Sequence, residues 1–264
     1  MSGWAGRLAG PPHPPELPEK ARPRWPPGYG FAAMAAGTGA VLLASFPLLP
    51  VALSSTVEGA LGALALLLLI LVQDAGYMAA AVGFAHLRRG RPRAWHFGLR
   101  ATPALRTGLV TLGATLVILG FEVGFVELVG IDDSETDELG TGDGFVPALA
   151  FSLAAIVVAP VAEEFFLITS AVFAALHLQY VATPLVFVII AVFALGTCLV
   201  YEATGSLFAV VAIHAVFNTL ATAGTDAGYV VPISVGAAVL VACVVVPLRL
   251  GPAPSPFPRT ALAR

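Results

Sequence analysis

Residues 145–162 of the chain read FVPALAFSLAAIVVAPVA and are followed directly by the acidic pair Glu163 and Glu164. An α-helix needs about 20 mostly apolar residues to cross roughly 30 Å of hydrocarbon, because each backbone amide must find its partner within the segment. This stretch therefore predicts a membrane-spanning helix that ends at two carboxylates.

Apolar stretches of similar length fill most of the chain. Of its 264 residues, 58% are hydrophobic and only 11% are charged, against roughly 25% charged residues in an ordinary soluble domain. The other stretches lie at residues 31–53, 60–84, 108–130, 165–183, 184–203, 206–223 and 229–248. The sequence therefore predicts an all-α, polytopic helical membrane protein with about eight transmembrane helices.

Charge and cysteine content exclude several classes of protein. The net charge of −3 leaves no basic face to neutralise phosphates, so nucleic acid is not an expected partner. Cys198 and Cys243 are the only thiols, and both lie inside apolar runs. Neither a disulfide framework nor a four-cysteine zinc site is therefore expected.

Proline and charge divide the chain into a membrane domain and two tails. Residues 1–30 contain eight prolines, and residues 250–264 are also rich in proline. Both segments are predicted to be disordered tails that flank a transmembrane domain at residues 31–249. Arginine dominates the link at residues 85–107, whereas the link at 131–144 is acidic and holds no Lys or Arg. The positive-inside bias then predicts a cell-membrane protein with both termini in the cytoplasm.

Ionisable side chains inside the apolar stretches are candidates for function, because each costs at least a few kcal/mol at membrane depth. The candidates, together with one amide, are Asp74, Glu122, Glu127, Glu163, Glu164, His177, Glu202, His214 and Asn218. Asp74 is interpreted either as a buried structural partner of Glu122 or as a proton-relay group. Glu202 is expected near an interface.

His214 and Asn218 are four residues apart, so a helix places them on one face within about 6 Å. Such a pair can hold a metal or orient a water molecule, or it can simply tie two membrane helices together. Glu163 and Glu164 can be a general base and its neighbour, or two interfacial carboxylates at a helix end. The spacings alone leave these alternatives open.

Five short motifs, in the order in which they occur, favour the catalytic alternatives for these two residue pairs. They are FGLR at 97–100, AEEFF at 162–166, FAALH at 173–177, TGSL at 204–207 and HAVFN at 214–218. Taken together, they resemble the successive motifs of the CAAX prenyl protease and bacteriocin-processing family (CPBP/ABI) of intramembrane proteases. The resemblance covers a protease-like core at about residues 95–223.

The resemblance implies a role for each matching residue. Glu163 corresponds to the glutamate that activates water and Glu164 to its supporting neighbour, while His177 belongs to the FxxxH motif. His214 and Asn218 match the HxxxN pair, which stabilises the oxyanion or contributes to a metal site. The implied cofactor is a divalent metal such as zinc, held by His177 and His214. The implied function is an intramembrane endopeptidase acting on a membrane-associated, prenylated CAAX substrate in the lipid bilayer.

Two departures from the family pattern support other hypotheses. The arginine position of the EExxxR motif is occupied by Ile168, and only 14 residues separate Glu163 from His177. A continuous helix rising 1.5 Å per residue would hold those two side chains about 21 Å apart. A catalytically silent relative that serves as a membrane binding or scaffold protein is therefore the main alternative. A small proton-coupled transporter using Asp74, Glu122 and Glu163 is a third hypothesis, although the Gly/Pro-broken spans typical of transporter halves are missing.

Overall fold

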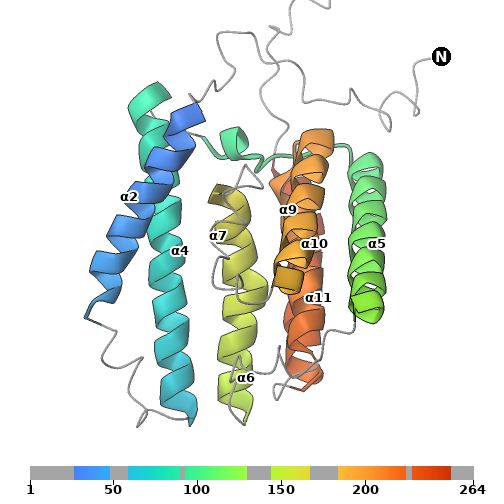
Figure 1. The fold of residues 1–264 in the computed structure, drawn as a ribbon. Coiled ribbons are helices and arrows are strands. Elements are labelled where there is room, and N and C mark those ends of the chain that lie inside the picture. The colour runs from blue at the N-terminus through green and yellow to red at the C-terminus, as the bar shows by residue number, and fades with distance from the viewer. Residues whose placement is uncertain are drawn as a thin grey trace, which may run out of the picture.

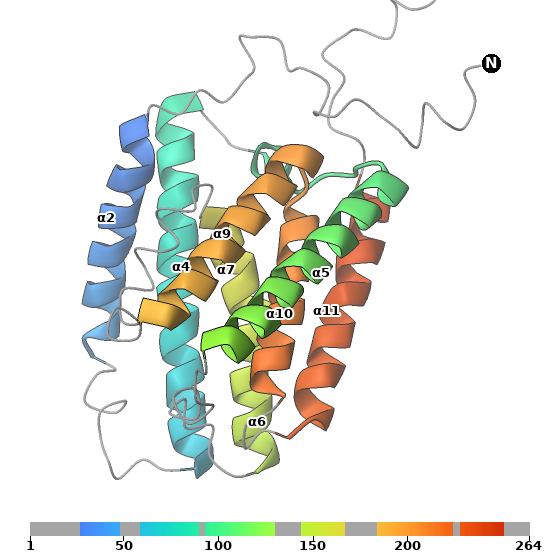
Figure 2. The same ribbon diagram turned by 45° about the vertical axis from the view of Figure 1, so that its right-hand side comes forward.

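The computed structural model describes residues 27–47, 59–89, 93–129, 144–166, 184–223 and 228–250. Every regular element in these ranges is a helix, and the longer helices stand side by side (Figures 1 and 2). The prediction of an all-α, polytopic membrane protein is therefore confirmed.

The helices match the predicted apolar stretches closely. The first half of the chain forms α2 (Pro27–Ser45), α4 (Gly59–Arg89), the short helix η1 (Ala94–Phe97) and α5 (Ala104–Val129). The second half forms one rod of three parts, α6 (Phe145–Ser152), η4 (Leu153–Val158) and α7 (Ala159–Phe166), followed by α9 (Pro184–Thr204), α10 (Leu207–Thr222) and α11 (Val230–Arg249). Helix α2 begins at Pro27, four residues before the predicted start at Phe31.

Five of these helical segments are long and apolar enough to cross a membrane. They are Leu67–Leu87, Ala104–Val129, Phe145–Glu164, Val186–Thr204 and Val230–Arg249. Two shorter apolar helices, Ala35–Ser45 and Leu207–Thr222, accompany them. The predicted span at 165–183 lies mostly outside the described residues, as do most of both tails, so the count of eight and the disordered tails stay predictions.

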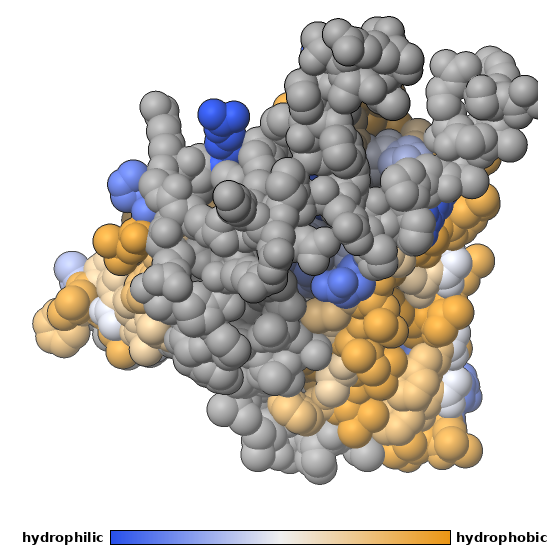
Figure 3. Space-filling view, turned by 90° about the horizontal axis from the view of Figure 1, so that it is seen from above, coloured by the Kyte–Doolittle hydropathy of each residue, from blue (hydrophilic) through white to orange (hydrophobic). Residues whose placement is uncertain are grey.

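The outer surface of the bundle is apolar. Val117 on α5 and Val244 on α11 are 72% and 64% exposed, and many other large hydrophobic side chains are exposed along these two helices. Seen from above, hydrophobic residues form much of the visible rim of the described part (Figure 3). A surface of this kind is stable against lipid and costly against water, so it supports the membrane assignment.

Helix α10 lies inside the bundle. It packs against α5, α7, α9, α11 and η4, and half of its residues are buried, including Val210, Ile213 and His214. A helix of 16 residues rises only about 24 Å, less than the hydrocarbon thickness. Its ends can stop short because protein surrounds the helix, and Ser206 caps its first turn by accepting a hydrogen bond from the Ala209 N–H.

The segment before α5 fixes the turn between α9 and α10. The Leu207 N–H donates to the Gly98 carbonyl at 3.1 Å, and the buried Arg100 Nε donates to the Gly205 carbonyl at 2.8 Å. Gly98 has φ +78°, and a Cβ there would lie 2.7 Å from the Tyr201 ring. The FGLR motif thus makes hydrogen bonds with the turn that connects α9 to α10.

Burial lowers the pKa of the Arg100 guanidinium, and the Tyr201 side chain opposes this shift. Because the ordinary pKa of arginine is above about 12, the group stays charged at neutral pH. Its charge lies beside the last carbonyls of α9, where the helix dipole favours a cation.

Candidate active site

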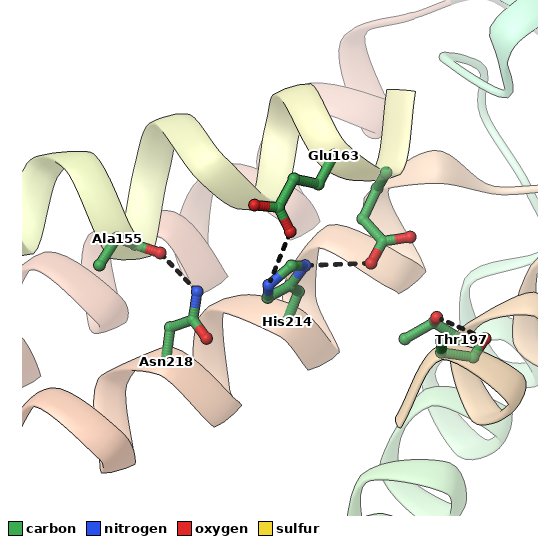
Figure 4. Close-up of polar contacts among 7 residues, drawn as sticks. Ala155, Glu163, Thr197, His214 and Asn218 are labelled. Carbon is green, nitrogen blue, oxygen red and sulfur yellow. Dashed lines mark hydrogen bonds and ion pairs between the residues drawn. The ribbon is translucent and has the colours of Figure 1, made fainter. Parts of the chain in front are cut away.

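The imidazole of His214 lies between the two adjacent carboxylates of α7. Its Nδ1 is 3.0 Å from Glu164 Oε1, and its Nε2 is 3.8 Å from Glu163 Oε2. Figure 4 shows both contacts between α10 and α7. Consecutive residues diverge by about 100° around a helix, so the pair can reach the two ring nitrogens from different directions. The structure thus brings together three of the five predicted site residues.

The two glutamates differ in contact and exposure. An ionised Glu164 can only accept a hydrogen bond, so the 3.0 Å contact assigns a proton to His214 Nδ1. The Glu164 side chain is 6% exposed, whereas that of Glu163 is 22% exposed. Within the described part of the chain, Glu163 Oε2 accepts no hydrogen bond. Glu164 is therefore committed to the histidine, whereas Glu163 Oε2 is buried without a hydrogen-bond partner among the described residues.

Aromatic packing holds the histidine ring in place. Phe193 of α9 meets the His214 ring edge to face, with ring centres 4.9 Å apart, and also packs on Phe217. Phe193 is buried in the same apolar cluster as Ile118 and Ile213. Because such packing restricts rotation of the imidazole, the ring is held towards α7.

Asn218 extends from the same face of α10 as His214 but contacts a different part of the rod. Its Nδ2 donates to the backbone carbonyl of Ala155 in η4 at 2.6 Å (Figure 4). The amide is therefore bound to main chain eight residues before Glu163 in the rod. No signal in the sequence pointed to Ala155.

Asp74 is a third buried carboxylate on the face of α4 that packs against α7. The side chain is only 3% exposed, and its Oδ2 has no hydrogen-bond partner among the described residues. Asp74 interacts electrostatically with Glu163. The structure thus associates Asp74 with the candidate site. The two interpretations from the sequence, a structural partner of Glu122 and a proton-relay group, stay predictions.

Two of the remaining positions singled out in the sequence lie outside the described residues. These positions are His177 and Ile168. The predicted site role of His177 and the predicted effect of having Ile168 in place of the motif arginine therefore stay predictions. Glu202 is exposed near the end of α9, as expected for an interfacial residue.

The described donors do not form a metal centre. No group of three or more His, Cys, Asp or Glu side chains that could hold a metal ion occurs in the described ranges. Both ring nitrogens of His214 already face carboxylates, whereas zinc sites normally use at least three protein ligands with direct bonds near 2.0 Å. His177, the other residue of the predicted metal pair, lies outside these ranges, so that pair stays a prediction.

A family comparison agrees with this arrangement. The family described as type II CAAX prenyl endopeptidase Rce1-like matches residues 165–220. This part of the chain is therefore similar to the CAAX protease family. The matched part begins directly after Glu164 and contains His177, His214 and Asn218. Neither a curated protein nor a solved structure matches the chain.

Proposed function

We propose that this protein belongs to the CAAX protease family and is an intramembrane endopeptidase in which Glu163 activates water. The observation that carries the proposal is the position of His214 between Glu163 and Glu164. A carboxylate whose Oε2 has no hydrogen-bond partner among the described residues, next to a histidine held by a second carboxylate, is a suitable arrangement for acid–base catalysis.

The first chemical step belongs to Glu163. The proposed nucleophile is a water molecule bound to both Glu163 Oε2 and His214 Nε2, which are 3.8 Å apart. Because Oε2 is buried, the side chains around it must move to admit this water. Glu163 takes a proton from this water as the oxygen forms a bond to the peptide carbonyl carbon. The resulting tetrahedral oxyanion collapses, the C–N bond breaks, and the protonated Glu163 returns its proton to the leaving amine.

His214, oriented by Glu164, is proposed to stabilise the negatively charged tetrahedral intermediate. Glu164 fixes the Nδ1 tautomer and orients the ring. Negative carboxylates on both sides of the ring favour the imidazolium form through Coulomb attraction. Its Nε2–H then donates to the oxyanion, a contribution that is strongest in a site with little water. His177 is proposed as a further stabilising group, as the family motif implies.

The proposed substrate is a membrane-associated peptide or protein that carries a prenylated CAAX sequence. The matched family is named for prenyl endopeptidases, and the apolar exterior places the protein in the bilayer that a prenyl group also enters. A location in the cell membrane with both termini in the cytoplasm is part of the proposal. The arginine of EExxxR is replaced by Ile168, so a silent relative that binds such substrates is the competing function.

Cleavage of a prenylated CAAX reporter peptide in proteoliposomes tests the proposal. We expect the wild type to cleave the peptide, and Glu163→Gln and His214→Ala each to lose about 100-fold or more in rate. Glu202→Gln is the matched control, because it makes the same change at an exposed carboxylate. Equal cleavage by all four proteins would overturn the site. Binding without cleavage by the wild type would show a silent relative.

A further inference from the structure

The helix that presents Glu163 and Glu164 is irregular where Asn218 meets it. Between α6 and α7, residues 153–158 form a π-helical turn. At the end of this turn, the Ala159 N–H donates to the carbonyl of Ala154, five residues earlier. An ordinary α-helix would direct that N–H to Ala155 instead.

Pro160 removes the alternative donor. In a π-helix the Ala155 carbonyl would accept from the N–H of residue 160, but proline has no N–H. The π-turn and the proline together therefore deprive Ala155 of both regular backbone donors. A carbonyl without a donor is costly inside a membrane, because no bulk water is present to replace the missing bond.

Asn218 supplies the missing donor from another helix. Its Nδ2 lies 2.6 Å from the Ala155 oxygen, a short hydrogen bond that only the amide nitrogen can make, because the acceptor is a carbonyl. One turn earlier on α10, His214 contacts Glu164 of the same rod. Two contacts from one face of α10 thus bind the irregular rod at two levels (Figure 4).

We propose that Asn218 is a positioning residue, whose amide replaces the backbone donor that Pro160 and the π-turn remove, and so fixes the rotation of α7 that aims Glu163 and Glu164 at His214. The effect on catalysis rests on the proposed function, whereas the effect on the helix does not. A direct contact between Asn218 and the reacting carbonyl is the alternative.

A double-mutant cycle between positions 160 and 218 of the full-length protein tests this proposal. Pro160→Ala restores a main-chain N–H that can reach the Ala155 carbonyl. In the Pro160 background, we expect Asn218→Ala to lower Tm by about 2–4 °C and the peptide cleavage rate by about 100-fold. In the Pro160→Ala background, the same substitution should change Tm by less than about 1 °C and the rate by less than about threefold.

The outcomes separate the two roles and also separate this proposal from the proposed function. An equal rate loss in both backgrounds, with Tm unchanged, would overturn positioning in favour of direct contact. If no reporter is cleaved, the Tm values of the double-mutant cycle still test whether Asn218 replaces the missing backbone donor. If Pro160→Ala does not fold, Asn218→Asp decides it, because an ionised Asp keeps the size but has no donor and should lower Tm at least as much as Asn218→Ala.

A matched control measures the general cost of removing one hydrogen bond from α10. Thr222 Oγ1 donates to the Asn218 carbonyl on the same helix, and Thr222→Val removes that bond while keeping the Asn218 side chain. Thr222→Val should cost the same Tm and rate in both position-160 backgrounds. A background dependence equal to that of Asn218→Ala would contradict a specific link to Ala155.

Discussion

Glu164 and His214 are 50 residues apart in sequence, and their side chains meet through a buried hydrogen bond of 3.0 Å between Oε1 and Nδ1. This bond joins α7 to α10 in the interior of the bundle. It gives Glu164 a role distinct from that of its neighbour Glu163, whose Oε2 is 3.8 Å from His214 Nε2.

Glu164→Gln should separate the role of charge from that of position. The Gln carbonyl can still accept from Nδ1–H, so we expect Tm to stay within about 1 °C. The charge that favours the imidazolium is lost, so kcat should fall about 10–100-fold. Peptide cleavage and thermal unfolding of the reconstituted protein measure both effects. A wild-type kcat would contradict the assigned role of Glu164.

Asp74→Asn should stabilise the protein. The substitution removes a buried like charge that interacts with Glu163, and a carboxylate oxygen that has no hydrogen-bond partner among the described residues. We expect the free energy of unfolding to rise by about 1 kcal/mol, as measured by denaturant titration in detergent. Glu202→Gln, at an exposed position, should change it little. A loss of stability in Asp74→Asn would mean that the carboxylate makes a favourable contact.

Arg100→Ala should weaken the connection between α9 and α10. It leaves the buried Gly205 carbonyl without the guanidinium donor, and bonds to charged groups contribute about 1.5–3 kcal/mol. We expect a destabilisation of that size, with Arg100→Lys recovering part of it because an ammonium also donates. The free energies of unfolding of the three proteins check this. Equal stability of Arg100→Ala and wild type would show that the bond is not important.

Gly98→Ala should also be destabilising, for a steric reason. The backbone has φ +78°, and the added Cβ would lie 2.7 Å from the Tyr201 ring and 3.0 Å from the Leu207 nitrogen. We expect a loss of about 1–3 kcal/mol in unfolding free energy. Gly108→Ala is the matched control, since a Cβ there meets nothing within 4 Å. Similar stabilities of the two variants would contradict the tight fit at Gly98.

Chelation tests whether a metal contributes. Both nitrogens of His214 face carboxylates, so we expect 1,10-phenanthroline to leave the cleavage rate within about twofold of the untreated value. A larger loss that added Zn²⁺ restores would instead support the metal pair of His177 and His214. The structural analogue 1,7-phenanthroline, which cannot chelate, is the control.

Several features of the site were predictable because they depend on local sequence. The spacing of His214 and Asn218 placed both on one face of a helix, and the structure confirms that they share this face. Charged groups in apolar spans need partners, and the structure places His214 next to the acidic pair, while the catalytic role of the pair stays a prediction. The partner of Asn218 was not predictable, because Ala155 contributes only its backbone.

The sequence by itself determined that the chain is a bundle of membrane helices, because hydrocarbon accepts a backbone only when each segment satisfies its own hydrogen bonds. Helix length and apolar composition are sufficient for that conclusion. Tertiary structure decided which polar groups meet. Glu164 reaches His214, and Asn218 reaches Ala155, because α10 is packed inside the bundle and its turn is held by Gly98 and Arg100. Contacts across 50 or more residues depend on the rotation and depth of whole helices, and no local pattern in the chain encodes these.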